Sequence, residues 1–227
     1  MTTLEEQWTA LAAIPQPQRR QAPWEDPELS GLTGFIRTLR DLLVCPGEFF
    51  AHVGAGSWTE PLIFALITST LGLLFSFFWH FLILVKGLPA DTAGLVFPLG
   101  LGPGALMGLM IAAPFLVVID LGLGGLCWWG SVALVGAGRE FALAWRVFCY
   151  AHGILVLAFI PIVGMPVAGI WLLVLLYIAA NRGLGLSALA SLVTLALFLA
   201  FQVALGMIFL LALIIGLAGL GLLALLG

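Results

Sequence analysis

The sequence predicts an all-α protein: a polytopic membrane helical bundle of about five transmembrane spans, preceded by an amphipathic interfacial helix. Hydrophobic residues make up 63% of the 227 positions, charged residues only 8%, and the mean hydropathy is +1.20. A water-soluble domain carries charges at about a quarter of its positions. Of the 19 charged residues here, 12 fall within the first 60 positions, so the last 167 positions share seven. Seven charges cannot cover a soluble surface, which indicates a membrane protein.

The same composition argues against several classes of function. A net charge of −3 without clustered Lys and Arg gives no basis for nucleic-acid binding. Cys45, Cys127 and Cys149 form neither a C-x-x-C pair nor a metal-ligand spacing with the three histidines. The sequence also shows no nucleophile–base pair and no phosphate-binding loop. We therefore expect no enzyme activity, no catalytic residue, no cofactor and no metal. The expected partner is the lipid bilayer, with other membrane proteins or a second copy of the chain as further candidates.

Residues 1–30 are expected to form a flexible, proline-rich tail. Pro15, Pro17, Pro23 and Pro27 lie among Gln, Arg, Glu and Asp, and this spacing prevents a long helix. The segment also has too few apolar residues to build a core. At most one short helix, over residues 4–13, is predicted in it.

Residues 31–60 are predicted to lie in the membrane interface as amphipathic helices. Apolar residues recur at three- and four-residue steps from position 32 to 43, while Arg37 and Arg40 occupy the other face. Such a stripe is typical of a helix that lies flat on a bilayer with its apolar side down. Pro46 restarts the chain in a second short helix, in which Phe49 and Phe50 are expected to anchor in lipid.

Two spans are predicted at about 61–85 and 104–128, within a transmembrane domain that covers residues 61–227. The 24 residues from 62 to 85 carry no formal charge, and a bilayer core of about 30 Å needs about 20 helical residues. Pro114 should kink the second span. Trp128 and Trp129 at its end are expected to form an interfacial pair, because aromatic belts lie at headgroup level.

The uncharged run of 35 residues from 147 to 181 is too long for one crossing. A single helix of that length would measure about 52 Å, whereas the bilayer core is about 30 Å thick. The sequence Ile160-Pro161-Ile162-Val163-Gly164-Met165-Pro166 provides the break. We therefore predict spans at about 142–160 and 166–182, joined by a tight turn.

A fifth span is predicted at about 188–208. The apolar tail 209–227 either continues that helix or returns as a sixth span, and no polar turn in the sequence distinguishes the two.

Positively charged residues predict the orientation of the bundle. An N-terminus in the cytoplasm leaves only Lys86 outside and places seven arginines inside: Arg19, Arg20, Arg37, Arg40, Arg139, Arg146 and Arg182. This agrees with the tendency of cytoplasmic loops to carry Lys and Arg.

Residues from about 35 to 205 resemble the Yip-one domain family, multi-span proteins named for eukaryotic members that interact with Ypt/Rab GTPases. Three stretches carry the resemblance: Thr38-Leu39-Arg40-Asp41-Leu42-Leu43 followed by Pro46 and Phe49-Phe50; Pro61-Leu62-Ile63-Phe64-Ala65-Leu66-Ile67; and Trp145-Arg146-Val147-Phe148-Cys149-Tyr150-Ala151 continuing to Ile160-Pro161-Ile162-Val163-Gly164. The positions Pro46, Pro61, Tyr150, Pro161 and Gly164 stand out among them.

The chain looks like the bacterial branch of that family. Eukaryotic members usually carry an Asp-Leu-Tyr-Gly-Pro motif before the first span, and nothing in this sequence matches it, which argues against a Rab-like partner. The resemblance implies a bundle of about five spans in the bacterial cytoplasmic (inner) membrane, with a cytoplasmic N-terminus. It implies no reaction.

Asp120 is the one carboxylate well inside a predicted span, and a charge there costs at least a few kcal/mol. Its expected partner is His152, because the two residues should lie at similar depth if the second and third spans are antiparallel neighbours. We expect their side chains within about 4 Å of each other, or within about 6 Å through a water, and both pointing into the bundle. A neutral Asp120 that serves only helix packing is the alternative to a proton or substrate relay.

Arg146 lies where the third span enters the membrane. The sequence suggests that it reaches up to lipid phosphates as an interface anchor, or forms a salt bridge, for instance to Glu140.

Two functions follow from the sequence as hypotheses. The first is a non-enzymatic membrane-organising or scaffold protein of the Yip-one type. The second is a small transporter, or transporter subunit, that uses Asp120 and His152.

Overall fold

The computed structural model describes residues 22–54, 56–86, 103–135 and 140–226. Throughout these ranges the regular structure is helical, and five helical units are long and apolar enough to cross a membrane. The predicted fold class, an all-α membrane bundle of about five spans, is confirmed.

The elements follow one another along the chain in three groups. The N-terminal group comprises η1 (Pro23–Glu25), α2 (Gly31–Val44) and α3 (Pro46–His52). The first two spans are α4 (Thr59–Val85) and α6 (Pro103–Leu134). The last three spans are α7 (Phe141–His152) with η2 (Gly153–Phe159), α8 (Gly164–Ile178) with η3 (Ala179–Gly183), and α9 (Ala188–Leu226).

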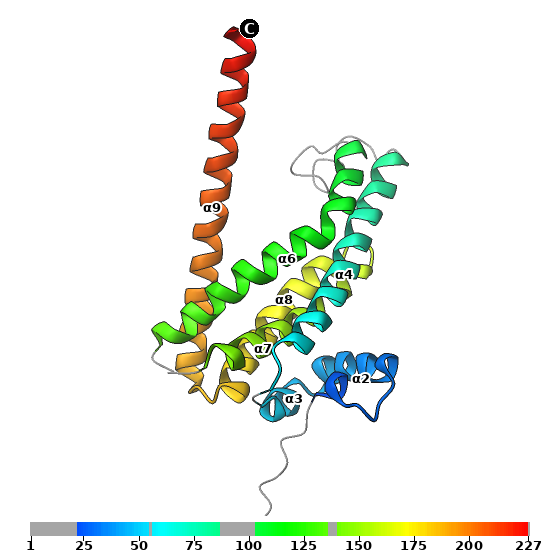
Figure 1. Cartoon of the computed structure of the whole chain (residues 1–227), viewed down its shortest axis with the longest axis vertical. Helices are drawn as coiled ribbons and strands as arrows, with labels where there is room; N and C mark the ends of the chain where they lie inside the picture. Colours follow the sequence, from blue (N-terminus) through cyan, green and yellow to red (C-terminus); the bar gives the residue numbers. More distant parts are fainter. Residues whose placement is uncertain (1–21, 55, 87–102, 136–139, 227) are drawn as a thin grey trace, which may run out of the picture.

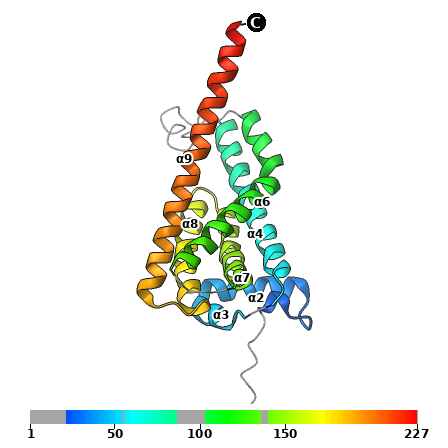
Figure 2. The ribbon, with the colours of Figure 1, turned by 60° about the vertical axis from the view of Figure 1, so that its left-hand side comes forward.

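The short helices α2 and α3 lie across one end of the bundle, which we call the base (Figures 1 and 2). The side chain of Ser30 accepts a hydrogen bond from the backbone of Thr33 and so caps α2. The face of α2 that carries Gly34, Thr38 and Leu42 is buried against the protein. Because of these contacts, α2 runs crosswise to the spans and does not continue into one.

The unit α7–η2 forms the centre of the bundle, and α4, α6 and α8 all contact it. Every residue from Arg146 to Ile154 is buried. Close approaches to its neighbours depend on glycine, because a Cβ on Gly72 of α4 would lie 2.0 Å from the carbonyl oxygen of Leu155. A Cβ on Gly153 would lie 2.3 Å from the ring of Phe64. The α-helix α7 passes into the 3-10 helix η2 in this region, where the chain contacts α4.

The tight turn predicted around Pro161 follows η2. Ile162 lies in the left-handed region at φ 65°, and Gly164 begins α8. A Cβ on Gly164 would lie 2.2 Å from the carbonyl oxygen of Leu157, so the turn folds directly back onto η2. The split of the long apolar run into two spans therefore has a structural basis in residues 160–164.

The last span, α9, contacts α6 near the base and then rises beyond the other helices (Figures 1 and 2). It begins after Ser187, whose hydroxyl accepts a hydrogen bond from the backbone of Ala190. Ser191, Thr194 and Phe198 of its first half are buried, whereas exposed apolar side chains prevail from Val203 to Leu211. Residues 209–226 continue the same helix without a turn, which is the first of the two alternatives left open by the sequence.

The observed helices differ from the predicted spans mainly at the second and fifth spans, α6 and α9. The helix α6 continues to Leu134, six residues past the predicted end at 128, and it changes direction along its length, with Pro114 inside it (Figure 1). Its continuation has a simple cause, since Val132 and Ser131 of the extra turns are buried against the protein.

Candidate functional site

A buried ion pair joins the N-terminal segment to the centre of the bundle at the base. Glu25, in η1, accepts hydrogen bonds of 2.7 and 2.9 Å from one guanidinium nitrogen of Arg146 in α7. The Tyr150 hydroxyl, one turn further along α7, donates to the same carboxylate at 2.5 Å. The side chains of Arg146 and Glu25 are only 3% and 10% exposed. We call Glu25, Arg146 and Tyr150 the base clamp.

Backbone carbonyl groups complete the surroundings of Arg146. Its Nε donates to the carbonyl oxygen of Gly54 at 3.0 Å, and its Nη1 donates to that of Ser57. Both acceptors lie in the segment between α3 and α4. One guanidinium therefore holds three separate pieces of chain together, which its planar array of donors suits well.

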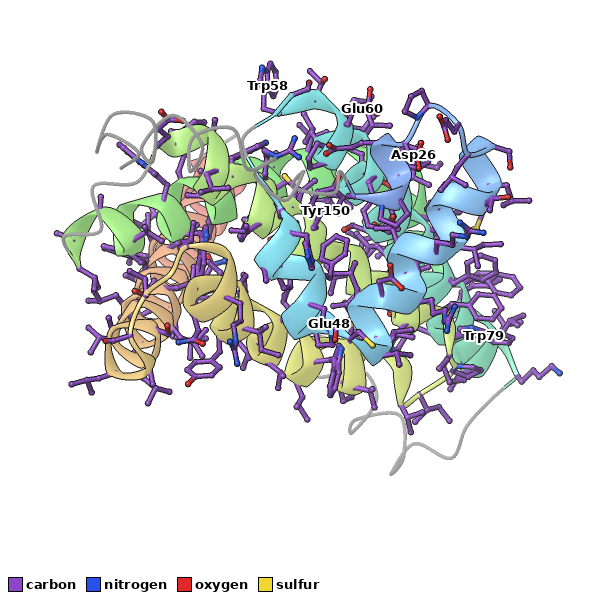
Figure 3. The ribbon with its side chains drawn as sticks, turned by 90° about the horizontal axis from the view of Figure 1, so that it is seen from below. Asp26, Glu48, Trp58, Glu60, Trp79 and Tyr150 are labelled. Atoms are coloured by element: carbon purple, nitrogen blue, oxygen red, sulfur yellow. The ribbon has the colours of Figure 1, made fainter. Side chains whose placement is uncertain are left out.

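Aromatic rings pack against the base clamp. Phe49 and Phe64 pack against the ring of Tyr150, with ring centroids 5.2 and 5.7 Å away. Trp24 packs in turn against Phe64. Figure 3, which looks at the base from below, shows Tyr150 near its centre. In such a low-dielectric setting, a charge-assisted hydrogen bond is stronger than it would be in water.

Local contacts place Glu25 at this position. The backbone N–H of Trp24 donates to the hydroxyl of Thr38 at 2.9 Å, and its indole N–H donates to the carbonyl oxygen of Glu60 at 3.0 Å. Pro23 crosses α2 so closely that a Cβ on Gly34 would lie 2.6 Å from its carbonyl oxygen. The segment η1 is thus fixed between α2 and the start of α4.

Three expectations from the sequence need correction here. Residues 22–30 belong to the folded base and are no part of a flexible tail, because Trp24 and Glu25 are bound in it; residues 1–21 lie outside the described ranges. Arg146 does not extend to lipid phosphates or to Glu140, since its donors are engaged by the base clamp and two carbonyl groups. Phe49 and Phe50 are buried in the core and are not lipid anchors.

The structure brings Asp120 and His152 together. Asp120 Oδ2 of α6 lies 3.8 Å from His152 Nε2 at the end of α7. The imidazole is almost fully buried, whereas the carboxylate side chain is 56% exposed and points to the outside of the bundle. The distance matches the expectation, but the expected orientation of Asp120 into the bundle is not found. The cause is that Val117 and Leu121 fill the inner face of α6 at this level.

A cavity of about 250 Å³ lies beside this pair, between α4, α6, η2 and α8. Its lining is apolar except for Asp120 and Ser69, and consists of Ser69, Leu73, Leu116, Val117, Asp120, Leu155, Ala158 and Met165. Ser69 also donates a hydrogen bond of 3.4 Å to the carbonyl oxygen of His152, where the α-helical pattern of α7 ends. The arrangement is an acid and an imidazole at the edge of an apolar space.

The remaining predicted positions fall into two groups. Arg37 and Arg40 are exposed on α2, where headgroups would meet them. Trp129 is 38% exposed, whereas Trp128 is fully buried against Phe198 and is no interfacial residue, because α9 covers it. Among the prolines and glycines singled out in the sequence, Pro46 and Pro61 lie in the first turns of α3 and α4, and Pro161 and Gly164 lie in the turn that leads into α8.

Sequence reasoning missed Glu25. In the sequence, Glu25 is one of several charges in a proline-rich segment, beside the aromatic Trp24. An aromatic residue so close to a helix start is the one signal that could have suggested packing. Within the described ranges, no three His, Cys, Asp or Glu residues are grouped so that they could hold a metal ion.

The fold and these two sites define a polytopic helical membrane protein with a folded base and an acid–imidazole pair inside its spans. Comparison with protein-family models, curated proteins and solved structures finds no match to this chain.

Proposed function

We propose that this chain is a non-enzymatic, membrane-organising protein of the Yip-one type, resident in the bacterial inner membrane with its N-terminus and base in the cytoplasm. The observation that carries the proposal is the exposure of apolar residues on α2. This helix is held crosswise at the base, yet part of its apolar side is exposed, namely Leu32, Ile36 and Leu43. We call these three residues the α2 stripe.

The geometry of α2 supports insertion into one leaflet. Successive residues of a helix lie about 100° apart, so the α2 stripe spans roughly 40° of its circumference, next to the buried face. Arg40 and Arg37 follow on the other side of the stripe, where lipid phosphates can bind them. An amphipathic helix of this kind sinks about 5 to 10 Å into the boundary between headgroups and acyl chains.

The base clamp holds α2 in a fixed position relative to the bundle. A free amphipathic helix can leave the surface, but α2 is tied through η1 and Glu25 to the centre of the bundle. The wedge is therefore permanent, and it lies in the same leaflet in every copy. Many copies together would expand one leaflet relative to the other and so organise or curve the membrane.

Reconstitution tests this function. The wild-type protein should reduce the mean diameter of vesicles, measured by electron microscopy at matched protein density. Ile36→Glu should abolish the effect because it places a charge within the α2 stripe. Val44→Glu is the matched control: Val44 is equally apolar and 67% exposed, but it lies on the arginine side of α2. Equal vesicle diameters for wild type and Ile36→Glu would refute the proposal.

A small transporter is the second candidate, favoured by the contact between Asp120 and His152 beside a cavity. Flux of protons or solutes into liposomes, with Asp120→Asn as the variant, tests it. Flux that is present in the wild type and lost in Asp120→Asn would favour the transporter over the membrane-organising function.

A further inference from the structure

The pair Asp120–His152 leaves two polar atoms that no described residue satisfies. His152 Nδ1 lies 3.2 Å from the carbonyl oxygen of Phe148, and a carbonyl can only accept, so Nδ1 carries the proton of that bond. In neutral imidazole, Nε2 is then a bare acceptor that faces Asp120. The distance of 3.8 Å to Oδ2 exceeds that of a hydrogen bond.

Two facing acceptors require a donor between them. Asp120 is the charged group that acts on His152 among the described residues. The groups that face the pair from α4, η2 and α8 are Ser69, Leu155 and Met165, and none of these brings a charge.

We propose that Asp120 and His152 form a binding site for an amphiphilic primary amine that enters from the lipid. An ammonium nitrogen can lie about 2.8 Å from Oδ2 and from Nε2 at the same time, and it has only donors to offer. The exposed side of Asp120 opens the site to the bilayer, and the adjoining apolar cavity of about 250 Å³ accepts the start of an alkyl chain.

The ammonium brings one positive charge to the carboxylate and an N–H donor to the neutral imidazole. No bond between heavy atoms is formed or broken. An amine site would give the transporter candidate a substrate class. Amine binding can be measured whether or not the protein transports amines, so a failed binding test and a failed transport test can be told apart. The amine site does not depend on the α2 stripe.

Octylamine binding to the full-length chain in phosphatidylcholine nanodiscs tests the proposal. We expect one saturable site per chain, measured by calorimetric titration. Asp120→Asn should weaken binding at least tenfold. Asp41→Asn, which removes a carboxylate at the base, should leave binding unchanged. Octyltrimethylammonium, with the same charge but no N–H donor, should show no saturable binding.

A second variant keeps the test decisive if Asp120→Asn perturbs folding. Leu73→Trp fills the cavity and leaves the pair intact, so it should weaken octylamine binding at least tenfold. Absence of saturable binding to the wild type would overturn the proposal. So would equal binding to Asp120→Asn, or equal binding of octyltrimethylammonium.

Discussion

Tyr150 donates its hydroxyl proton to Glu25, across a distance of 2.5 Å, at a point where the first described residues of the chain meet its central span. The same carboxylate also accepts from Arg146. One acidic side chain is thereby bound by two donors on successive turns of α7, and the base of the molecule depends on it.

Replacing Glu25 with Gln should destabilise the protein by about 3 kcal/mol, because a guanidinium that is 3% exposed would lose its counter-charge. Thermal unfolding in detergent measures this. Glu28→Gln is the matched control, since Glu28 is exposed in the same segment. A Glu25→Gln protein as stable as the control would show that the ion pair contributes nothing.

Tyr150→Phe should cost less, about 1.5 to 3 kcal/mol, because it removes one hydrogen bond to a charged acceptor and leaves the ring in place. A double-mutant cycle with Glu25→Gln, followed by thermal unfolding, should show that the two effects are not additive. Strict additivity would mean that hydroxyl and carboxylate act independently.

Gly72→Ala should destabilise the bundle by about 1 to 3 kcal/mol. Its Cβ would lie 2.0 Å from the carbonyl oxygen of Leu155, and a backbone atom cannot move aside as a flexible side chain can. The control is Gly108→Ala in α6, where no heavy atom lies within 4 Å of the new Cβ. Chemical unfolding compares the two variants, and an equal midpoint would contradict the close packing of α4 on η2.

Spin labels on α2 should report a helix lying along the membrane surface. We expect labels at Arg37 and Arg40 at headgroup level and a label at Ile36 several ångströms deeper, as measured by depth-dependent quenching. A label from this helix at the centre of the bilayer would show that α2 crosses the membrane.

The orientation of the bundle can be tested with the native Cys45, which is exposed at the base, and with Ile162→Cys in the turn after η2. A membrane-impermeant maleimide should label Cys45 from the cytoplasmic side and the new cysteine from the opposite side. Reaction of both from one side would invalidate the predicted topology.

The spans could be predicted from the sequence because their cause is local. A membrane core needs about 20 apolar residues, and Pro161 with Gly164 marks the break between two spans within a few positions. The proximity of Asp120 and His152 also followed from counting residues along two antiparallel helices. In each case, length and composition determine the result.

The base could not be predicted, because its contacts join residues that are far apart in the sequence. The spacing of apolar residues in α2 predicts that one side of the helix is apolar. It does not predict that Thr38 and Leu42 face the protein while Ile36 stays exposed. Likewise, an arginine at the end of a span looks the same whether it meets a phosphate or a buried Glu25. Only the arrangement of the whole chain distinguishes these two.

Glu25 and Arg146 are separated by 121 positions, and this distance has a consequence for biogenesis. At a synthesis rate of 5 to 20 residues per second, about 6 to 24 s pass between the two residues leaving the ribosome. During that interval, Glu25 has no counter-charge and the base cannot close. The nascent chain must therefore keep its N-terminal segment open, as a substrate for chaperones or proteases, until the third span has been inserted.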